Sequence, residues 1–298
     1  MMSPRLLITS LITGTVLVAC SPATEDKVIM YNCGTQPITA DFSAKQLTLL
    51  VNDQQLTFVS EPAASGTRYF NPDNNAQFWT KGDEGQLIID NDIYPLCLKQ
   101  GALPQQLSAR GNEPFWLLHR KGLNASLRRP SGDLDFTQVS VSSSSETGQW
   151  DIELDENSSL TLEAKPCTDS MSGMPYPYAA TLVHNNTELS GCAGEPRQLL
   201  AGGTWELSNT GLTQAPTITF MNDGKVSGYA GCNRFFGGYR LTGERLTLER
   251  MAATKMMCSP TEMTVENTYL EQLATVNRFS IENNQLILHY DGGQLVFQ

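Results

Sequence analysis

Short runs in which apolar and polar residues alternate fill most of the chain, and residues that favour turns separate them. In Gln46–Ser60, two such runs flank Asn52-Asp53, a pair that favours a two-residue β-hairpin turn. The segment Gly85–Leu98 repeats this arrangement. Because a period of two is typical of strands with one buried face, the first third is predicted to consist of antiparallel hairpins.

The other two thirds continue the same pattern. In the middle third, "SLTLEAKPC" and "YAATLVHNNTELSGC" are predicted to form strands, and in the last third "GGYRLTGERLTLER" and "NQLILHYDGGQLVF" are predicted hairpins. We therefore expect a mainly β protein with three small antiparallel domains of the β-barrel or sandwich type.

One helix is predicted between the last two hairpins, at about 260–276. Ser259, Pro260 and Glu262 provide an N-cap, a proline at the first helical position and the glutamate of a capping box. The apolar residues that follow at helical spacing are Val265, Tyr269, Leu273 and Val276. We expect this helix to pack across a curved sheet.

The N-terminus has the pattern of an export signal. Arg5 precedes the uncharged run Leu6–Val18, which is shorter than the roughly 20 residues of a membrane-spanning helix. The stretch "LVAC" resembles the bacterial lipobox, which implies a signal peptide over 1–19, cleavage before Cys20 and lipidation of its thiol, with palmitate expected. Ser21 after the cysteine implies outer-membrane localisation, and 20–27 reads as a tether. A plain signal peptide with an incidental cysteine is the alternative.

The six remaining cysteines predict disulfide bonds, because they are even in number and belong to an exported chain. Six cysteines allow fifteen pairings. Pairing neighbours would place one bridge in each third of the chain: Cys33 with Cys97, Cys167 with Cys192, and Cys232 with Cys258. No C-x-x-C occurs, and we expect no metal site and no cofactor.

The acidic charge balance argues against nucleic acid as a partner. The full chain has a net charge of −11, and without Arg5, the only charged residue of the leader, the net charge is −12. Binding to nucleic acid or to anionic membrane surfaces needs basic patches. The net negative charge suits a cationic partner, although many soluble exported proteins are acidic without such a partner.

No enzyme signature is present. His119, His184 and His289 have no partner at metal-ligand spacing, and the serine of "GKVSG" (Gly224–Gly228) is misplaced for a nucleophile elbow. Neither a P-loop nor a dinucleotide-binding fingerprint occurs. The chain is predicted not to be an enzyme.

Residues 28–100 resemble the membrane-bound inhibitors of C-type lysozyme. The resemblance is carried by "YNC" (Tyr31–Cys33), "SGTRY" (Ser65–Tyr69), "FWTKG" (Phe78–Gly82) and the closing Cys97. It implies that Ser65 and Lys81 enter the lysozyme cleft and meet its catalytic carboxylates, and that Gly66, Tyr69, Trp79 and Gly82 belong to the same partner-binding surface. Between these motifs, the Asn-rich segment "FNPDNNAQ" (Phe70–Gln77) departs from the family pattern, which affects where the lysine lies relative to the cleft.

The rest of the chain resembles two further domains. Residues 101–198 are similar to an uncharacterised bacterial lipoprotein family, through "GNEPFW" (Gly111–Trp116) and the segment Cys167–Cys192. There, Asp169, Ser170 and Ser172 predict a stabilised turn. Residues 199–298 resemble the META domain of a heat-shock-inducible lipoprotein through "GTWELSN", "GYAGCNRFFGGY" and "ATKMMC". That resemblance implies a role in envelope stress, and Gly231-Cys232-Asn233 predicts a tight bend pinned by a disulfide.

Together these features predict an outer-membrane lipoprotein that faces the periplasm and inhibits C-type lysozyme, a cationic protein, by placing Ser65 and Lys81 in its active-site cleft. The alternative is an envelope-integrity or assembly scaffold in which the inhibitor-like domain has only a structural role.

Overall fold

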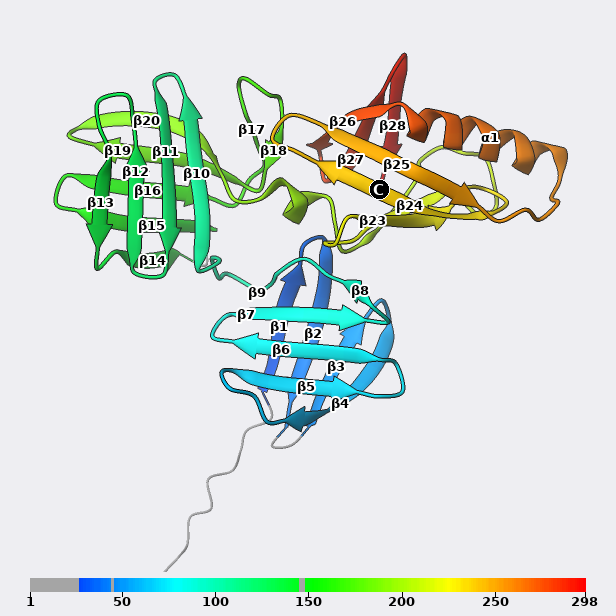
Figure 1. Ribbon diagram of the computed structural model, residues 1–298, viewed down its shortest axis with the longest axis horizontal. Helices are drawn as coiled ribbons and strands as arrows, with labels where there is room; N and C mark the ends of the chain where they lie inside the picture. Colours follow the sequence, from blue (N-terminus) through cyan, green and yellow to red (C-terminus); the bar gives the residue numbers. More distant parts are fainter. Residues whose placement is uncertain (1–26, 44–45, 145–147) are drawn as a thin grey trace, which may run out of the picture.

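The computed structural model describes residues 27–43, 46–144 and 148–298, and it is mainly β (Figure 1). The expected signal peptide and Cys20 lie outside the described residues. Three units follow one another along the chain: a first barrel, a middle sheet and a C-terminal unit that carries the helix α1. The predicted fold class is confirmed.

The first barrel is a ring of eight strands, to which one further short strand is added. The strands are β1 (Lys27–Cys33), β2 (Gln36–Phe42), β3 (Gln46–Val51), β4 (Gln54–Glu61), β5 (Thr67–Asn71), β6 (Ala76–Lys81), β7 (Glu84–Ile89), β8 (Asp92–Ile93) and β9 (Cys97–Lys99). They pair in the order β6-β5-β4-β3-β2-β1-β9-β7-β8, and pairing of β6 with β7 closes the ring.

The alternating residues of these strands fill the barrel. Leu47, Leu49 and Val51 of β3 are buried, and the residues between them are not. Asn52-Asp53 forms the predicted turn, with φ of 48° and 61°, in the left-handed region that such hairpin turns require. The second hairpin also turns as predicted, at Asp90-Asn91, but its return strand ends at Ile93. Cys97 instead starts β9, which pairs with β1 and β7.

The middle sheet has nine strands in the order β13-β12-β11-β10-β20-β19-β16-β15-β14. These are β10 (Gln106–Asn112), β11 (Phe115–Lys121), β12 (Asn124–Arg128), β13 (Leu134–Thr137), β14 (Ser140–Ser144), β15 (Gln149–Asp155), β16 (Ser158–Glu163), β19 (Tyr178–His184) and β20 (Thr187–Ala193). Between β16 and β19 the chain leaves the sheet to form the small pair β17 (Cys167–Thr168) and β18 (Pro175–Tyr176). Met174 and Tyr176 of this excursion pack into the core of the C-terminal unit.

The C-terminal unit begins with a short 3₁₀ helix, η1 (Pro196–Leu199). Its strands are β21 (Thr204–Glu206), β22 (Thr217–Phe220), β23 (Lys225–Tyr229), β24 (Arg234–Leu241), β25 (Leu246–Ala253), β26 (Val276–Glu282), β27 (Gln285–Tyr290) and β28 (Gly293–Phe297). They form sheets of five and three strands. The backbones of Glu206 and Gln298 exchange two hydrogen bonds of 2.9 Å, which joins the sheets between β21 and the end of β28.

Helix α1 (Pro260–Ala274) has the predicted capping box at Ser259 and Glu262. Tyr269 and Leu273 are buried in the core as expected. The prediction that the helix reaches Val276 is wrong by two residues, because Val276 pairs with Tyr290 and opens β26.

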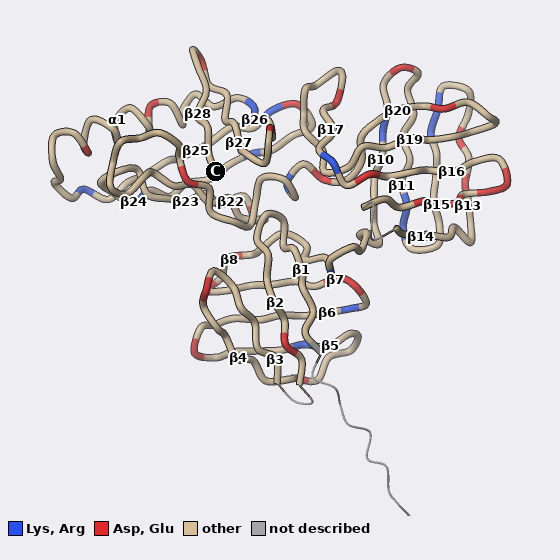
Figure 2. The backbone as a smooth tube through the Cα atoms, turned by 180° about the vertical axis from the view of Figure 1, so that it is seen from behind, with Lys and Arg blue, Asp and Glu red and all other residues tan. Residues whose placement is uncertain are grey.

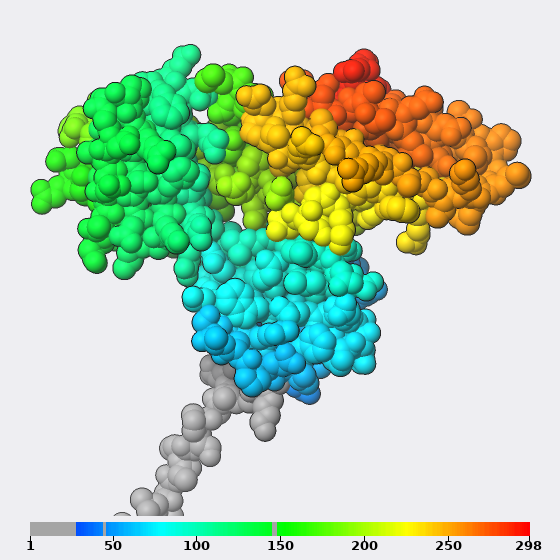
Figure 3. All heavy atoms as spheres, viewed as in Figure 1, coloured from blue at the N-terminus to red at the C-terminus, as the bar shows by residue number. Residues whose placement is uncertain are grey.

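The three units pack against one another. Figure 3 shows the first barrel beneath the junction of the other two units. Thr35 donates its backbone N–H to the carbonyl oxygen of Ala201 at 2.9 Å and accepts the N–H of Gly203 at its hydroxyl at 2.8 Å. Met221 of the C-terminal unit packs with the core residues of the first barrel. These contacts therefore attach the first barrel to the C-terminal unit.

Candidate functional site

Ser65 lies in the turn before β5, and Lys81 is the last residue of β6, the strand that pairs with β5. Figure 1 shows β5 and β6 side by side in the first barrel. Strands β5 and β6 pair through Thr67 and Thr80. The next residues beyond this pair, Gly66 and Lys81, are therefore adjacent, and a Cβ placed on Gly66 would lie 3.2 Å from that of Lys81. Two motifs that are separate in the sequence thus form one surface.

Gly66 allows this close approach. Its φ is +68°, and a Cβ at this position would lie 2.2 Å from the carbonyl oxygen of Thr80. Both the backbone conformation and the contact distance exclude a side chain. Gly82 has a φ of +64° and turns the chain from Lys81 toward β7.

Trp79 supports the Ser65 turn from the neighbouring strand. Its indole N–H donates to the carbonyl oxygen of Ser65 at 2.9 Å, and its ring is half-buried. Phe78 is fully buried and meets Tyr31 edge to face, with 5.5 Å between the ring centroids. These two aromatic residues therefore fix the base of the turns.

Tyr69 lies inside the barrel wall and not on the surface with Ser65. Only 8% of the residue is exposed, and its ring packs against Phe42 at 5.7 Å. Burial raises the pKa of its phenol. Tyr69 is one of the six residues predicted to bind the partner, but it supports that surface from inside the barrel.

The ammonium group of Lys81 is exposed, and it has no ion-pair partner in the described part of the chain. The acidic residues next to it are engaged elsewhere: Asp83 binds Lys99 at 2.9 Å, and Glu84 accepts the backbone N–H of Gln105 at 2.6 Å. Figure 2 shows the basic end of β6 beside the acidic turn into β7. Lys81 is therefore available to a partner, although acidic groups lie nearby.

Glu84 is a residue that the sequence did not single out. By binding Gln105 it attaches the turn after Lys81 to the segment that leads into the middle sheet. Nothing in its sequence surroundings distinguishes it from other hairpin glutamates, because its partner lies 21 residues further on.

The disulfide pairing predicted from neighbouring cysteines is confirmed: Cys33–Cys97, Cys167–Cys192 and Cys232–Cys258. The first bridge joins directly paired residues of β1 and β9, so it helps to hold the barrel ring together.

The third bridge, Cys232–Cys258, lies beside Asn233, which is 1% exposed and donates its backbone N–H to the carboxylate of Glu266 at 2.6 Å. Gly231, with φ of 107°, forms the predicted bend.

The turn after Cys167 is also stabilised as predicted. The carboxylate of Asp169 accepts the backbone N–H groups of Met171 and Ser172 and the hydroxyl of Ser172, at 2.8 to 3.1 Å. Asn112 donates to its other oxygen at 3.1 Å. Burial pushes the pKa of Asp169 up, but these hydrogen bonds outweigh it and leave the pKa below its ordinary value. All of these contacts stabilise the turn itself.

Each histidine contacts a serine across neighbouring strands: Ser108 and His119, Ser158 and His184, and Ser280 and His289, all at 2.9 Å. A catalytic Ser–His pair also needs a group that orients the histidine. Among the described residues, none of these rings is hydrogen-bonded to a carboxylate. The pairs are accounted for as cross-strand contacts within the sheets.

The described residues contain no cluster of His, Cys, Asp and Glu suited to a metal ion. They also contain no helix with the length and apolar character needed to cross a membrane.

The first barrel thus displays an exposed lysine, which has no ion-pair partner among the described residues, beside a serine turn. Comparison with known families identifies the type of domain. Residues 31–94 match the family model described as membrane-bound lysozyme-inhibitor of c-type lysozyme, and residues 181–298 match the META domain. The chain therefore contains a lysozyme-inhibitor-type domain followed by a META domain, as the sequence motifs predicted.

The META match begins at Thr181, within β19. It thus includes parts of two strands, β19 and β20, that the structure places in the middle sheet. The boundary expected at 199 stays a prediction.

Similar solved structures cover about a third of the chain each. One is the NMR structure of a protein from Burkholderia xenovorans, with 27% identity and a TM-score of 0.29. That match covers 34% of this chain and 82% of the other. Another is the crystal structure of a duf4847 family protein from Bacteroides vulgatus, with 16% identity and a TM-score of 0.28. That match covers 35% of this chain and 96% of the other. Scores this low assign neither fold nor function. The search of curated proteins found no match.

Proposed function

We propose that this protein is a lipid-anchored inhibitor of C-type lysozyme at the periplasmic face of the outer membrane, and that it inserts Ser65 and Lys81 into the catalytic cleft. The observation that carries this proposal is the position of the Lys81 ammonium, which has no ion-pair partner among the described residues, beside the Ser65 turn. The match of residues 31–94 to the inhibitor family supports it.

The chemistry of the target explains why a lysine would inhibit it. Lysozyme needs one protonated and one ionised carboxyl group. A nearby ammonium favours the ionised form of both, because an opposite charge lowers a carboxyl pKa. The general acid would then lose its proton, and both carboxylates would accept charge-assisted hydrogen bonds from Lys81. The Ser65 hydroxyl would add one more bond.

Long-range charge favours the same partner. Residues 28–100 contain 4 basic and 8 acidic residues, so the domain attracts a cationic lysozyme from a distance. Lys81 then provides the local positive charge that the acidic cleft requires. The META domain suggests that the protein acts during envelope stress.

Inhibition of a C-type lysozyme by the soluble chain 22–298 tests this proposal. Lys81→Ala should weaken inhibition more than tenfold, because truncating one partner of a desolvated charge pair costs about 2–5 kcal/mol. Ser65→Ala should have a smaller effect in the same direction. The matched control is Lys121→Ala, which removes the same charge from an exposed position on β11.

A folded, oxidised parent chain that leaves lysozyme fully active would refute the proposed inhibition. Equal inhibition by the parent and Lys81→Ala would refute the role of the lysine. Either result would direct attention to the scaffold alternative.

A further inference from the structure

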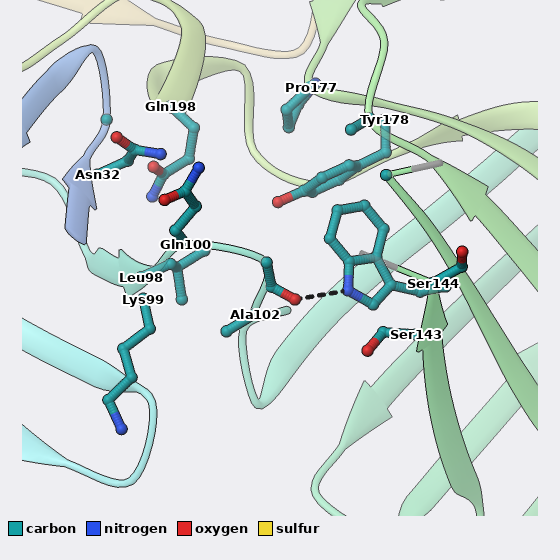
Figure 4. Close-up of a pocket in the computed structure, with 15 residues that line it drawn as sticks. Asn32, Leu98, Lys99, Gln100, Ala102, Ser143, Ser144, Pro177, Tyr178 and Gln198 are labelled. Carbon is teal, nitrogen blue, oxygen red and sulfur yellow. Dashed lines mark hydrogen bonds between the residues drawn. The ribbon is translucent and has the colours of Figure 1, made fainter. Parts of the chain in front are cut away.

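A cavity of about 600 Å³ lies between the first barrel and the middle sheet (Figure 4). Its walls come from the end of β1, from β9 and the segment that follows it as far as Ala102, from strands β14 and β15, and from Pro177, Tyr178 and Gln198. Its volume falls within the range of about 300–1,000 Å³ that is common for ligand sites. Neither Ser65 nor Lys81 lines it, so it is separate from the proposed inhibitory surface.

Hydrogen-bonding side chains converge on this cavity without partners of their own. The amides of Asn32, Gln100 and Gln198 and the hydroxyl of Tyr178 form no hydrogen bond with any described residue. Figure 4 shows the three amides together on one side, with the Tyr178 hydroxyl pointing toward them. Each amide offers two donors and an acceptor, a combination that suits ligand groups able both to donate and to accept.

The described lining is nearly uncharged. Lys99 is its one charged residue, and its ammonium is bound to Asp83 at 2.9 Å. An ionic ligand would therefore find no free charged side chain on these walls. The groups that remain suit hydroxyl and acetamido substituents.

An aromatic wall faces these amides. Trp150 and Tyr178 pack edge to face with 5.5 Å between their centroids. The indole N–H of Trp150 donates to the carbonyl oxygen of Gly101 at 3.0 Å, which joins this wall to the segment after the first barrel. A rigid aromatic wall opposite a few convergent polar groups is the usual composition of a small-molecule site.

We propose that this cavity binds a short, uncharged oligosaccharide. The ring C–H faces of a sugar would pack on the apolar wall formed by Tyr178 and Pro177, while its hydroxyl and acetamido groups would exchange hydrogen bonds with Asn32, Gln100 and Gln198. The site is built from all three units: Asn32 belongs to the first barrel, Tyr178 to the middle sheet and Gln198 to η1 of the C-terminal unit. The Trp150 to Gly101 bond ties the middle sheet to the segment that leaves the first barrel.

Calorimetric titration of the chain 22–298 with chitotriose and with maltotriose tests the proposal. We expect saturable binding of at least one of them, weakened about fivefold to tenfold in Gln100→Ala and in Gln198→Ala, the effect of losing one hydrogen bond. Gln77→Ala, a half-buried position on β6 outside the cavity, is the matched control. Because Gln100 is exposed, its variant should keep the parent Tm.

Absence of saturation by either sugar up to about 10 mM would overturn the proposal. So would binding that both cavity variants leave unchanged, or binding of tri-alanine in place of the sugars. No lysozyme is present in this assay, so its failure would leave the proposed inhibition standing, and a failure to inhibit lysozyme would leave this site standing.

Discussion

At the scale of single residues, Gly66 is the position most sensitive to change in the proposed inhibitory surface. Gly66→Ala places a methyl group 2.2 Å from the carbonyl oxygen of Thr80 at a φ of +68°. Backbone strain of this kind costs about 1–3 kcal/mol, and the contact adds to it. We expect a lower unfolding free energy in urea and weaker inhibition.

The control for Gly66 is Gly101→Ala, which has a φ of +81° but open space around its Cβ position. It isolates the cost of the backbone conformation. A Gly66→Ala variant as stable as Gly101→Ala would show that the Ser65 turn yields easily and is not fixed by the contact with Thr80.

Trp79 permits a second test at this scale. Trp79→Phe keeps an aromatic ring but removes the N–H that binds the Ser65 carbonyl oxygen at 2.9 Å. The loss of one such bond costs about 1 kcal/mol. Because this bond orients the Ser65 turn, we expect faster dissociation of lysozyme in surface-binding kinetics, together with a fall in Tm of about 2 °C. Unchanged dissociation would mean that the turn keeps its shape without Trp79.

At the scale of secondary-structure elements, the capping box of α1 makes a local contribution that can be measured. In Ser259→Ala the N–H of Glu262 loses its side-chain acceptor. Loss of such a cap costs about 1 kcal/mol. We expect a fall in Tm of about 2 °C by calorimetry. Thr261→Ala, an exposed first-turn position, should leave the Tm unchanged, and equal falls in both variants would contradict a specific cap.

The elements were predictable where their signals are local. The hairpin turn at Asn52-Asp53 and the start of α1 at Ser259 each depend on a few adjacent residues, and both predictions were correct. The ends of elements depend on distant partners. Val276 continues the helical spacing, but its pairing with Tyr290 places it in a strand. Cys97 likewise leaves its predicted hairpin because β1 and β7 lie on either side of it.

At the scale of the whole molecule, buried tyrosines predict sensitivity to alkaline pH. Burial raises the pKa values of Tyr31, Tyr178 and Tyr239 to about 12, and the charge of Asp83 adds to the effect at Tyr31. The unfolded chain loses these protons near pH 10, whereas the folded chain retains them to about pH 12. Their contribution to stability is therefore complete below pH 10 and is lost as the pH rises from 10 to 12.

Urea unfolding at pH 9 and pH 11 measures this effect, and absorbance at alkaline pH follows the phenolates. Tyr31 lies in the first barrel, Tyr178 in the middle sheet and Tyr239 in the C-terminal unit. We therefore expect each of the three units to lose stability at alkaline pH. Tyr31→Phe should reduce the pH dependence, because it removes one of the phenols whose pKa is raised in the folded chain. A stability that stays constant from pH 9 to pH 11 would contradict the raised pKa values.

The sequence by itself determined most of the strands and their turns, the helix cap and the motifs of the two families, because each depends on neighbouring residues or on short motifs. Only the tertiary structure decided which of the fifteen possible disulfide pairings forms, that β6 pairs with β7 to close the barrel, and that Gly66 meets Lys81. It also decided that Met221 joins the first core and that three amides surround one cavity. These features arise from contacts between distant segments, whose free energy depends on the packing of the whole chain and leaves no local pattern in the sequence.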